Sequence, residues 1–451
     1  MDEVLIVGAG PVGLFLAAEL KRQGHTPIVV DRLPKPTGLS KALGVQGSGV
    51  ALLEARGLLP LFEADAAPPV AGGLHFAGLP LAEPTQFLFV LQARMEAVLE
   101  AHLASLGVTV RRGVELEGFE QDGETVRVTL RSDGESRSVD VRYLVGCDGG
   151  SSTVRALAGI EFPGTEPTIL LRLGDVRMPG AVMTPQGLRL PGGVRAPFGV
   201  GVPLDDGYFR VVAREPYPPG FDRKAPFELD ELQAAVRRSF GIDIPMAEPR
   251  WLSRFTDASR QAATYRAGRV LLAGDAAHVH LPAGGPGIST GLHDAANLAW
   301  RLSAVLGGHQ PDAWLDGYGE ERHPAGARVL AQTQAQAALM TKAANVQALR
   351  GLLGELFEVP EARRFIARRV QGADTRYGAD PDPRVGRWMP TPLDLRRGRF
   401  VLLATDFRND WGDRLEVRRA EQPMLVRPDG YVAWAGDGDV RAAVARWLGT
   451  P

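Results

Sequence analysis

Residues 4–31 carry the pattern that most constrains the fold. An apolar run at 4–7 is typical of a buried strand, and Gly8, Gly10 and Gly13 follow it directly. Leucine and alanine then recur at helical spacing until a second apolar run, which ends at Asp31. This β-α-β unit predicts a dinucleotide site, in which the glycines let a pyrophosphate approach a helix N-terminus and Asp31 binds a ribose. The alternative is a glycine-rich turn that binds no nucleotide.

Two further motifs place an aspartate after an apolar strand. Residues 143–146 lead to Asp148 and Gly149, and residues 269–273 lead to Gly274 and Asp275. A carboxylate at the end of a buried strand can bind the hydroxyl groups of an extended ribityl chain, which NAD lacks. The three motifs together therefore predict a bound flavin.

The segment after Asp275 is rich in glycine and opens a helix. Residues 282–291 contain two prolines and four glycines and continue into an apolar helix face. Unpaired N–H groups at a helix N-terminus create a positive potential, which would stabilise a reduced flavin at its N1–C2=O edge. The simpler alternative is a tight strand-to-helix turn. Glycine favours the ligand, because it lets the backbone approach closely.

The remaining periodicity predicts an α/β protein in which a sheet domain is inserted into the nucleotide-binding domain. We expect helices at 42–59, 94–106, 229–240, 287–307, 325–370 and 438–448, an antiparallel meander at 108–145, short strands across 165–258, an extended segment at 376–399, and strands at 400–404 and 424–426. The expected domains are a discontinuous FAD-binding domain (1–70, 90–165 and 260–325), a substrate-binding sheet domain (71–89 and 166–259), a helical connector (326–375) and a C-terminal module (376–451).

Composition excludes several classes of function. The 451 residues carry a formal charge of -2 with no basic stripe, so we expect neither nucleic acid nor membrane as a partner. The single cysteine, Cys147, excludes an intrachain disulfide, a CxxC redox pair and a cysteine-rich zinc site, and is expected to be an inert core thiol in a cytoplasmic protein. Asp2 and Glu3 replace the basic start of a signal peptide.

The motifs resemble the single-component FAD-dependent aromatic hydroxylases, the p-hydroxybenzoate hydroxylase-like family, and within it the branch of aromatic-polyketide hydroxylases and rifampicin monooxygenases. The segments that carry this resemblance, over essentially the whole chain, are Gly8-x-Gly10-x-x-Gly13, Asp148-Gly149-x-x-Ser152-x-Val154-Arg155, Gly274-Asp275-Ala276-Ala277-His278, Asp294-Ala295-x-Asn297-Leu298-x-Trp300, Tyr318-x-x-Glu321-Arg322 and residues 425–434. The resemblance implies a Rossmann-type FAD-binding domain of the GR2 type and a short, degenerate thioredoxin-like C-terminal module.

The same resemblance implies a reaction. NADPH or NADH reduces FAD, the reduced flavin captures O2 as a C4a-hydroperoxide, and one oxygen atom hydroxylates a polycyclic aromatic of the polyketide phenol or quinone type. Inactivation of a rifamycin-like antibiotic and Baeyer-Villiger insertion remain open alternatives. Outside catalysis, the chain could be a redox-silent FAD-binding protein, and either a monomer or a homodimer is expected.

The resemblance also implies the cofactor-binding residues: Gly8, Gly10, Pro11, Val12, Gly13, Asp31, Arg32, Lys41, Gln92, Asp148, Gly149, Arg155, Gly274, Asp275, Pro282, Gly285, Gly287, Ile288 and Ser289. Lys41, Pro282 and Pro286 are expected near the isoalloxazine ring. The chain departs from the family pattern at Lys41 and Ser48, where arginine is usual, and at Pro286, where glutamine is usual. Pro286 removes an N–H donor from the loop expected beside the flavin.

Other residues invite a catalytic interpretation that the sequence does not require. His278 and His280 have no carboxylate or cysteine at ligand spacing, so a hydrogen-bonded structural role is expected and no metal site. For His293 a solvated or packing role is expected rather than proton transfer. Arg155 faces either a phosphate or an acidic partner, and no general base is identified. The candidates for the substrate side are Phe87, Phe89, Arg172, Arg195 and Phe198, with ordinary sheet packing as the alternative.

Overall fold

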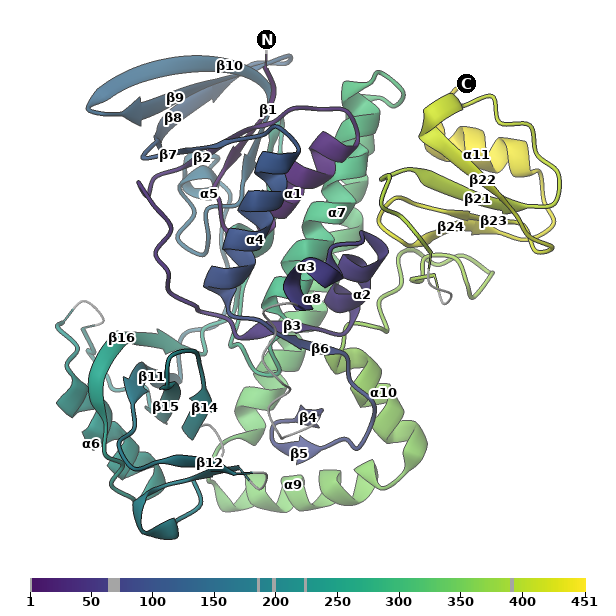
Figure 1. Ribbon diagram of the computed structural model, residues 1–451. Coiled ribbons are helices and arrows are strands. Elements are labelled where there is room, and N and C mark those ends of the chain that lie inside the picture. The colour runs from purple at the N-terminus through teal and green to yellow at the C-terminus, as the bar shows by residue number, and fades with distance from the viewer. Residues whose placement is uncertain (1, 64–73, 185–186, 197–199, 223–224, 390–392) are drawn as a thin grey trace.

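The computed structural model describes residues 2–63, 74–184, 187–196, 200–222, 225–389 and 393–451. An α/β body contains the N-terminus, a second sheet lies at its lower end, and a small C-terminal sheet lies beside it (Figure 1). In the described part of the chain, no helix is both long and apolar enough to span a membrane.

The main sheet has the order β18-β19-β10-β1-β2-β7, and β8 and β9 extend it through β10. Strands β1, β2, β7, β10 and β19 are paired in parallel, with Leu5 opposite both Ile28 and Leu144. The turns after the parallel strands therefore meet at one edge, which brings Gly8, Asp31 and Gly274 together. The bounds are β1 Asp2–Val7, β2 Ile28–Asp31, β7 Val110–Arg112, β8 Glu115–Gln121, β9 Val126–Ser132, β10 Glu135–Gly146, β18 Arg266–Ala267 and β19 Val270–Leu272.

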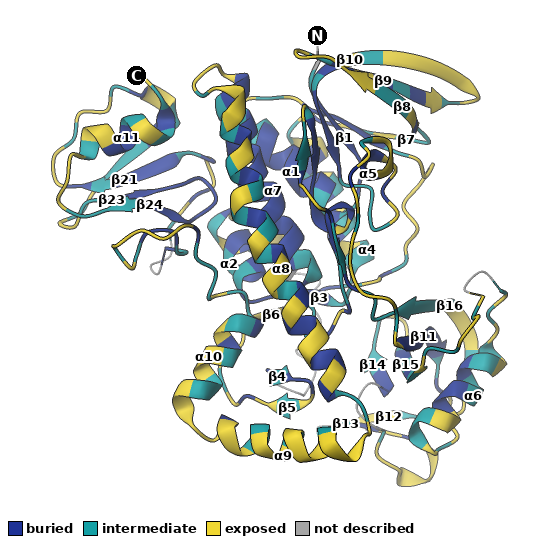
Figure 2. Ribbon diagram, turned by 180° about the vertical axis from the view of Figure 1, so that it is seen from behind, coloured by how far each residue is buried: buried dark blue, intermediate teal, exposed yellow. Residues whose placement is uncertain are grey.

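Three helices pack on this sheet, α1 (Pro11–Arg22), α4 (Gln92–Ser105) and α7 (Gly287–Leu306) (Figure 1). The strands and the inner faces of these helices form one apolar core (Figure 2). Gly291 allows α7 to approach the glycine turn, because a Cβ there would lie 2.5 Å from Val12. The predicted β-α-β unit and the antiparallel meander β8-β9-β10 are confirmed.

The prediction of one helix at 42–59 is wrong. Residues Gly44–Gln46 form β3, which pairs with β6 (Phe87–Phe89), and the helices α2 (Ser48–Ala55) and α3 (Leu59–Glu63) follow. Gly47 has a φ of +52°, which is outside the helical region and separates the strand from α2. A Cβ on Gly44 would lie 2.3 Å from the Leu88 carbonyl oxygen, so glycine is needed for this strand pairing.

The second sheet has the order β14-β15-β11-β16, and α6 covers it. This confirms the strands and the helix predicted between 165 and 258. The bounds are β11 Ile169–Arg177, β12 Val182–Thr184, β13 Gly187–Arg189, β14 Val200–Pro203, β15 Tyr208–Pro216, α6 Leu229–Phe240 and β16 Ala247–Thr256. The short pairs β4–β5 (His75–Phe76 and Leu79–Pro80) and β17–β20 (Arg260–Gln261 and His278–Val279) lie outside both sheets.

The helical region predicted at 325–370 starts earlier and is divided. It consists of α8 (Asp316–Leu339), α9 (Ala344–Phe357) and α10 (Pro360–Val370), so α8 crosses the predicted boundary at 325/326. The helix α5 (Thr153–Leu157) completes the body. The division into domains stays a prediction.

The C-terminal sheet has the order β22-β21-β23-β24, and the helix α11 (Val440–Leu448) packs on it. Strands β21 (Phe400–Ala404) and β23 (Met424–Val426) were predicted. Strands β22 (Leu415–Arg419) and β24 (Val432–Ala435) were not, because β22 has only two apolar residues and β24 follows a turn of polar residues. The extended segment 376–399 pairs with this module through the bridge Trp388–Tyr431.

Buried ion pairs hold the C-terminal module against the body. Glu19 of α1 and Arg56, which follows α2, are fully buried and 2.6 Å apart, and Arg56 also donates to the Pro428 carbonyl at 2.7 Å. Arg427 donates to Glu321 of α8 at 2.7 Å and pairs with the buried Asp429. The Arg427–Glu321 pair crosses the contact, whereas Glu19 compensates Arg56 within the body, so each of these buried charges has a partner.

Replacement of Glu19 by glutamine should destabilise the protein by about 3 kcal/mol, because it leaves the Arg56 charge buried and unpaired. Burial alone would raise the pKa of Glu19, but Arg56 and Arg22 outweigh it and lower the pKa. The pair therefore stabilises the fold above the pKa of the unfolded chain, and its contribution falls as the pH drops through the lowered pKa.

Urea unfolding at neutral and acidic pH measures this effect. The matched control is Glu100→Gln, since Glu100 pairs with Arg112 at 2.6 Å with a side chain that is 30% exposed. That variant should cost less than about 1 kcal/mol. Equal losses in the two variants would contradict the role given to the buried pair.

Candidate functional site

The glycine turn between β1 and α1 leaves a helix N-terminus open. A Cβ on Gly8 would lie 2.4 Å from the Cys147 carbonyl oxygen, and one on Gly13 would lie 2.0 Å from that of Gly8, so both positions require glycine. Gly10 has open space around it and is the N-cap of α1, with no side-chain cap and no acidic residue in the first turn. The free N–H groups of this turn can therefore meet an anion such as a pyrophosphate.

Asp31 closes the same turn. Its carboxylate accepts hydrogen bonds from the N–H groups of Ala9 at 2.8 Å and Leu33 at 2.9 Å. Arg32, which follows it, is exposed. The structure thus places the Asp31 carboxylate beside the glycine turn, as a ribose contact requires.

The predicted residues Lys41 and Gln92 lie on neighbouring segments. Gln92 begins α4, and its side-chain oxygen accepts from the Ala42 N–H at 3.2 Å. Lys41 is exposed, and its carbonyl accepts from Arg210 at 3.2 Å. Arg210 is buried, pairs with Asp175 at 2.8 Å and also donates to the Ser40 carbonyl. This pair fixes the Lys41 loop to the second sheet, and sequence reasoning missed it.

Asp148 and Arg155 both bind the backbone of the site. The Asp148 carboxylate accepts from Ser152 Oγ at 2.6 Å and from the Thr153 N–H at 2.7 Å, which fixes the start of α5. Arg155 donates to the carbonyls of Ala276 at 2.8 Å and Gly150 at 2.9 Å. Its hydrogen-bond partners in the described structure are therefore carbonyl groups and not an acidic side chain, and they join the second motif to the third. The Arg155 guanidinium also lies over the Phe162 ring, 3.7 Å from its centre.

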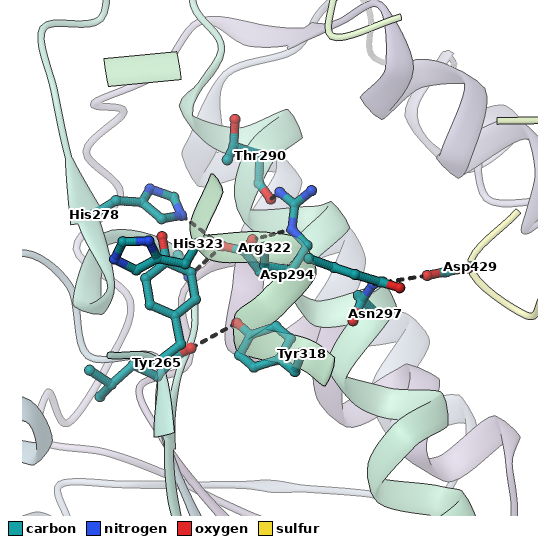
Figure 3. A network of polar contacts seen from close by, with 12 residues as sticks. Tyr265, His278, Thr290, Asp294, Asn297, Tyr318, Arg322, His323 and Asp429 are labelled. Carbon is teal, nitrogen blue, oxygen red and sulfur yellow. Dashed lines mark hydrogen bonds and ion pairs between the residues drawn. The ribbon is translucent and has the colours of Figure 1, made fainter. Parts of the chain in front are cut away.

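Asp294 is the centre of a buried polar network (Figure 3). It lies on α7 with no exposed surface and accepts from Arg322 Nε at 2.7 Å and from the Gly274 N–H at 3.1 Å. His278 Nε2 lies 2.7 Å from the same carboxylate. Burial alone would raise the pKa of Asp294, but Arg322 and His278 outweigh it and lower the pKa. Asp294 therefore stays ionised and fixes the Gly274 turn to α7.

The N-terminus of α7 is open. Its N-cap is Pro286, with no side-chain cap and no acidic residue in the first turn, and Gly285 before it has a φ of +68°. The Ser289 hydroxyl donates to the Gln46 carbonyl at 2.9 Å, which fixes this end of α7 to β3. Asp275 is exposed, and its carboxylate accepts no hydrogen bond from a residue that the structure describes. An unpaired carboxylate thus lies in the loop that leads from β19 to this end of α7.

The histidines and Cys147 have structural environments. His278 is hydrogen-bonded as expected, and His280 Nδ1 lies 2.9 Å from the Leu281 carbonyl. The solvated alternative for His293 is wrong, because this ring is buried and lies edge-on to Trp388 and Tyr431. Burial lowers the pKa of His293 to about 4 and raises that of Cys147, so at neutral pH His293 is uncharged and Cys147 is a thiol. The described residues include no cluster of metal-ligating side chains.

The candidates for the substrate side do not form one group. Arg172 is buried and forms ion pairs with Glu215 and Glu231, so its charge is already used within the second sheet. Arg195 and Phe87 are exposed, Phe89 is buried, and Phe198 lies outside the described residues. The sequence did contain a sign of the missed Arg210–Asp175 pair. Asp175 is an acidic residue within the apolar strand β11, and a buried charge needs a partner.

Comparisons with known proteins identify the family. The FAD binding domain family matches residues 1–333, and the family described as aromatic-ring hydroxylase, C-terminal, matches residues 382–451. An anhydrotetracycline hydroxylase from Streptomyces rimosus has a solved structure with a TM-score of 0.88 and 38% identity, over 100% of this chain and 99% of that one.

Two other relatives also match over the full length. A rifampicin monooxygenase from Streptomyces venezuelae is 38% identical over 100% of this chain and 99% of its own. The structure of a Diels-Alderase from the biosynthetic pathway of pyrroindomycins matches with a TM-score of 0.85 and 37% identity, over 100% of both chains. These matches confirm the predicted fold class and the resemblance. The chain belongs to the family of FAD-dependent monooxygenases that hydroxylate aromatic rings.

Proposed function

We propose that the protein uses NADPH or NADH and O2 to hydroxylate a polycyclic aromatic of the polyketide phenol or quinone type. In this reaction one oxygen atom of O2 enters a C–H bond of the substrate, the other leaves as water, and the nicotinamide supplies two electrons. The observation that carries the proposal is the open N-terminus of α7 together with the unpaired Asp275 carboxylate, in a chain that matches an anhydrotetracycline hydroxylase over its full length.

The residues of the site fit FAD. The Gly8–Gly13 turn, with Pro11 and Val12, would hold the pyrophosphate at the start of α1, and Asp31 with Arg32 would hold the adenosine ribose. Asp275 would bind ribityl hydroxyls. Gln92, Lys41 and the Asp148–Gly149 turn would line the cofactor from the other side. When bound, FAD supplies the electron transfer from the nicotinamide and the activation of O2.

The first turn of α7 would stabilise the negative charge of the reduced flavin. The N–H groups of Gly287, Ile288 and Ser289 have no acceptor earlier in the helix, so they can donate to the N1–C2=O edge of the ring. The positive end of a 20-residue helix stabilises negative charge at that edge. Pro282, Gly285 and Pro286 shape the approach, and Pro286 at the N-cap contributes no N–H donor. Arg155 acts as a positioning residue, because it joins Gly150 to Ala276.

A second function is favoured by a specific relative. The Diels-Alderase matches this chain over its full length at 37% identity. A protein with this fold is therefore named for a cycloaddition and not for an oxygenation. If this chain has such a role, FAD is bound but redox-silent, and the product is an isomer of the substrate. Inactivation of a rifamycin-like compound and Baeyer-Villiger insertion would use the same oxygen chemistry on other substrates.

Incubation under labelled O2 separates these functions. FAD-loaded protein, NADPH or NADH, and a panel of tetracycline-type, angucycline-type and rifamycin-type aromatics should give one product that contains a single labelled oxygen atom. Mass spectrometry detects the label, and fragmentation distinguishes ring hydroxylation from insertion beside a ketone. A product of unchanged mass, formed without loss of NADPH or NADH, would support the redox-silent function and contradict the monooxygenase.

Replacement of Asp275 by asparagine should weaken FAD binding by about tenfold, because one charge-assisted hydrogen bond is worth about 1.4 kcal/mol here. Stability without FAD should not change, since the carboxylate has no partner within the described protein. Quenching of flavin fluorescence measures the affinity and urea unfolding measures the stability. An unchanged affinity would exclude Asp275 from the flavin site.

Replacement of Asp294 by asparagine should instead destabilise the protein by about 3 to 5 kcal/mol, because the buried Arg322 loses its compensating charge. FAD affinity should fall as well, since Gly274 and His278 lose their common partner. The same two measurements apply. A variant that keeps wild-type stability would contradict the account of this network.

The proposal extends to the organisation of the protein. We propose the discontinuous FAD-binding domain, the substrate-binding sheet domain, the helical connector and the C-terminal module as functional units, in a cytoplasmic monomer or homodimer. The separate apolar clusters of the body, the second sheet and the C-terminal sheet support this division, whereas residues 74–81 pack with α8, α9 and α10 of the connector.

A further inference from the structure

A small polar cavity lies on the side of α7 that faces α8 and the end of α10. The N-cap Pro286 and three residues of α7, Ser289, Thr290 and His293, line it, and their spacing places them on one face of the helix. The other walls come from Gln46 and Ser48 near β3, from Arg322 and Gln332 of α8, and from the segment 369–375. The cavity has a volume of about 40 Å³, which is room for a few water-sized groups.

The charges that line this cavity have one sign. Arg322 and Arg369 are on its wall, and none of its lining residues is an aspartate or a glutamate. Asp294 compensates Arg322. The half-buried Arg369 side chain, in contrast, forms neither an ion pair nor a hydrogen bond with any residue that the structure describes. One positive charge is therefore left over at the cavity.

A buried hydrogen-bonding group on the same wall also has no partner. Gln332 is only 6% exposed, and its amide has no hydrogen bond within the described chain. His293 on the same wall is 5% exposed, and its ring lies against the Ser48 backbone. Buried polar groups are normally paired, and unpaired ones indicate a ligand or ordered water. Here the Gln332 amide opens onto the same space as the unpaired guanidinium of Arg369.

We propose that this cavity binds a small monovalent anion, of the size of a halide or formate, between Arg369, Gln332 and the first turns of α7. The guanidinium and the amide supply N–H donors, and the positive end of α7 adds to the attraction. Arg322 contributes its remaining donors, since three of its N–H groups are used by Asp294, Tyr377 and the Thr290 carbonyl. Ser48 and Pro286 both line the cavity.

The site is next to the proposed flavin position but uses different groups. The N–H groups of Gly287, Ile288 and Ser289 are assigned to the flavin, whereas the anion site uses side chains of α8 and α10. The Thr290 hydroxyl donates to the Pro286 carbonyl at 3.0 Å. The Ser289 hydroxyl is already bonded to Gln46. Anion binding therefore does not depend on the proposed oxygen chemistry.

The experiment compares FAD-loaded wild type with Arg369→Gln, Arg369→Lys and a matched control, Arg368→Gln. Arg368 is the exposed neighbour on the same helix. The thermal midpoint is measured while sodium gluconate is replaced by sodium chloride, bromide or formate at constant ionic strength. A ligand of the native state raises the midpoint in a saturable way. Wild type and Arg368→Gln should show this rise, and Arg369→Gln should need at least tenfold more anion.

The same experiment distinguishes an inorganic anion from a carboxylate, and a diffraction measurement locates the bound anion. A response to halide identifies an inorganic anion, and a response to formate alone identifies a carboxylate. Anomalous diffraction from bromide-soaked crystals of the FAD-loaded protein should give a peak at the cavity. Arg369→Lys keeps the charge and should retain part of the response. Equal responses in Arg369→Gln and Arg368→Gln, or water alone in the cavity, would overturn the proposal. Flavin absorbance in every sample reports separately whether FAD is bound.

Discussion

The buried carboxylate of Asp294 is the interaction on which the site depends. It lies within α7, and its two oxygens meet the backbone of Gly274, the ring of His278 and the guanidinium of Arg322. Each of these partners belongs to a different segment, namely the turn after β19, the strand β20 and the helix α8. One ionised group therefore fixes the positive end of α7 relative to the loop that carries Asp275. Ser289, which donates to Gln46, and Arg155, which donates to Ala276, add separate contacts beside the helix terminus and beside Asp275.

Buried, paired carboxylates also hold the C-terminal module in place. Glu321 of α8 accepts from Arg427, and Asn297 of α7 donates to both Glu321 at 2.7 Å and Asp429 at 3.2 Å. Burial alone would raise the pKa of Glu321, but Arg427 and Arg301 lower it to about 2. These charges supplement the apolar cluster that joins Trp300 of α7 to the module, and removing one partner of a buried pair is strongly destabilising. The helices α7 and α8 thus connect the module to the proposed flavin site.

Local patterns predicted most of the fold, because the glycine turns and apolar runs depend on residues near each other in sequence. The helix predicted at 42–59 failed for a long-range reason, since β3 exists only through its pairing with β6. The same reason hid the Arg210–Asp175 pair, whose value lies in the contact with the loop at Ser40 and Lys41. The sequence left a phosphate and an acidic side chain as the possible partners of Arg155. Its carbonyl partners could not be predicted, because Gly150 and Ala276 come together only in the tertiary structure.

The motifs therefore identified the residues proposed to hold the cofactor, while the tertiary structure explains how these residues are held together. The most direct test of this account is a crystal structure of the protein with FAD. We expect the N1–C2=O edge to lie within hydrogen-bond distance of the N–H groups of Gly287, Ile288 and Ser289, and ribityl hydroxyls to contact Asp275. An isoalloxazine ring bound away from α7, with Asp275 still facing solvent, would contradict it.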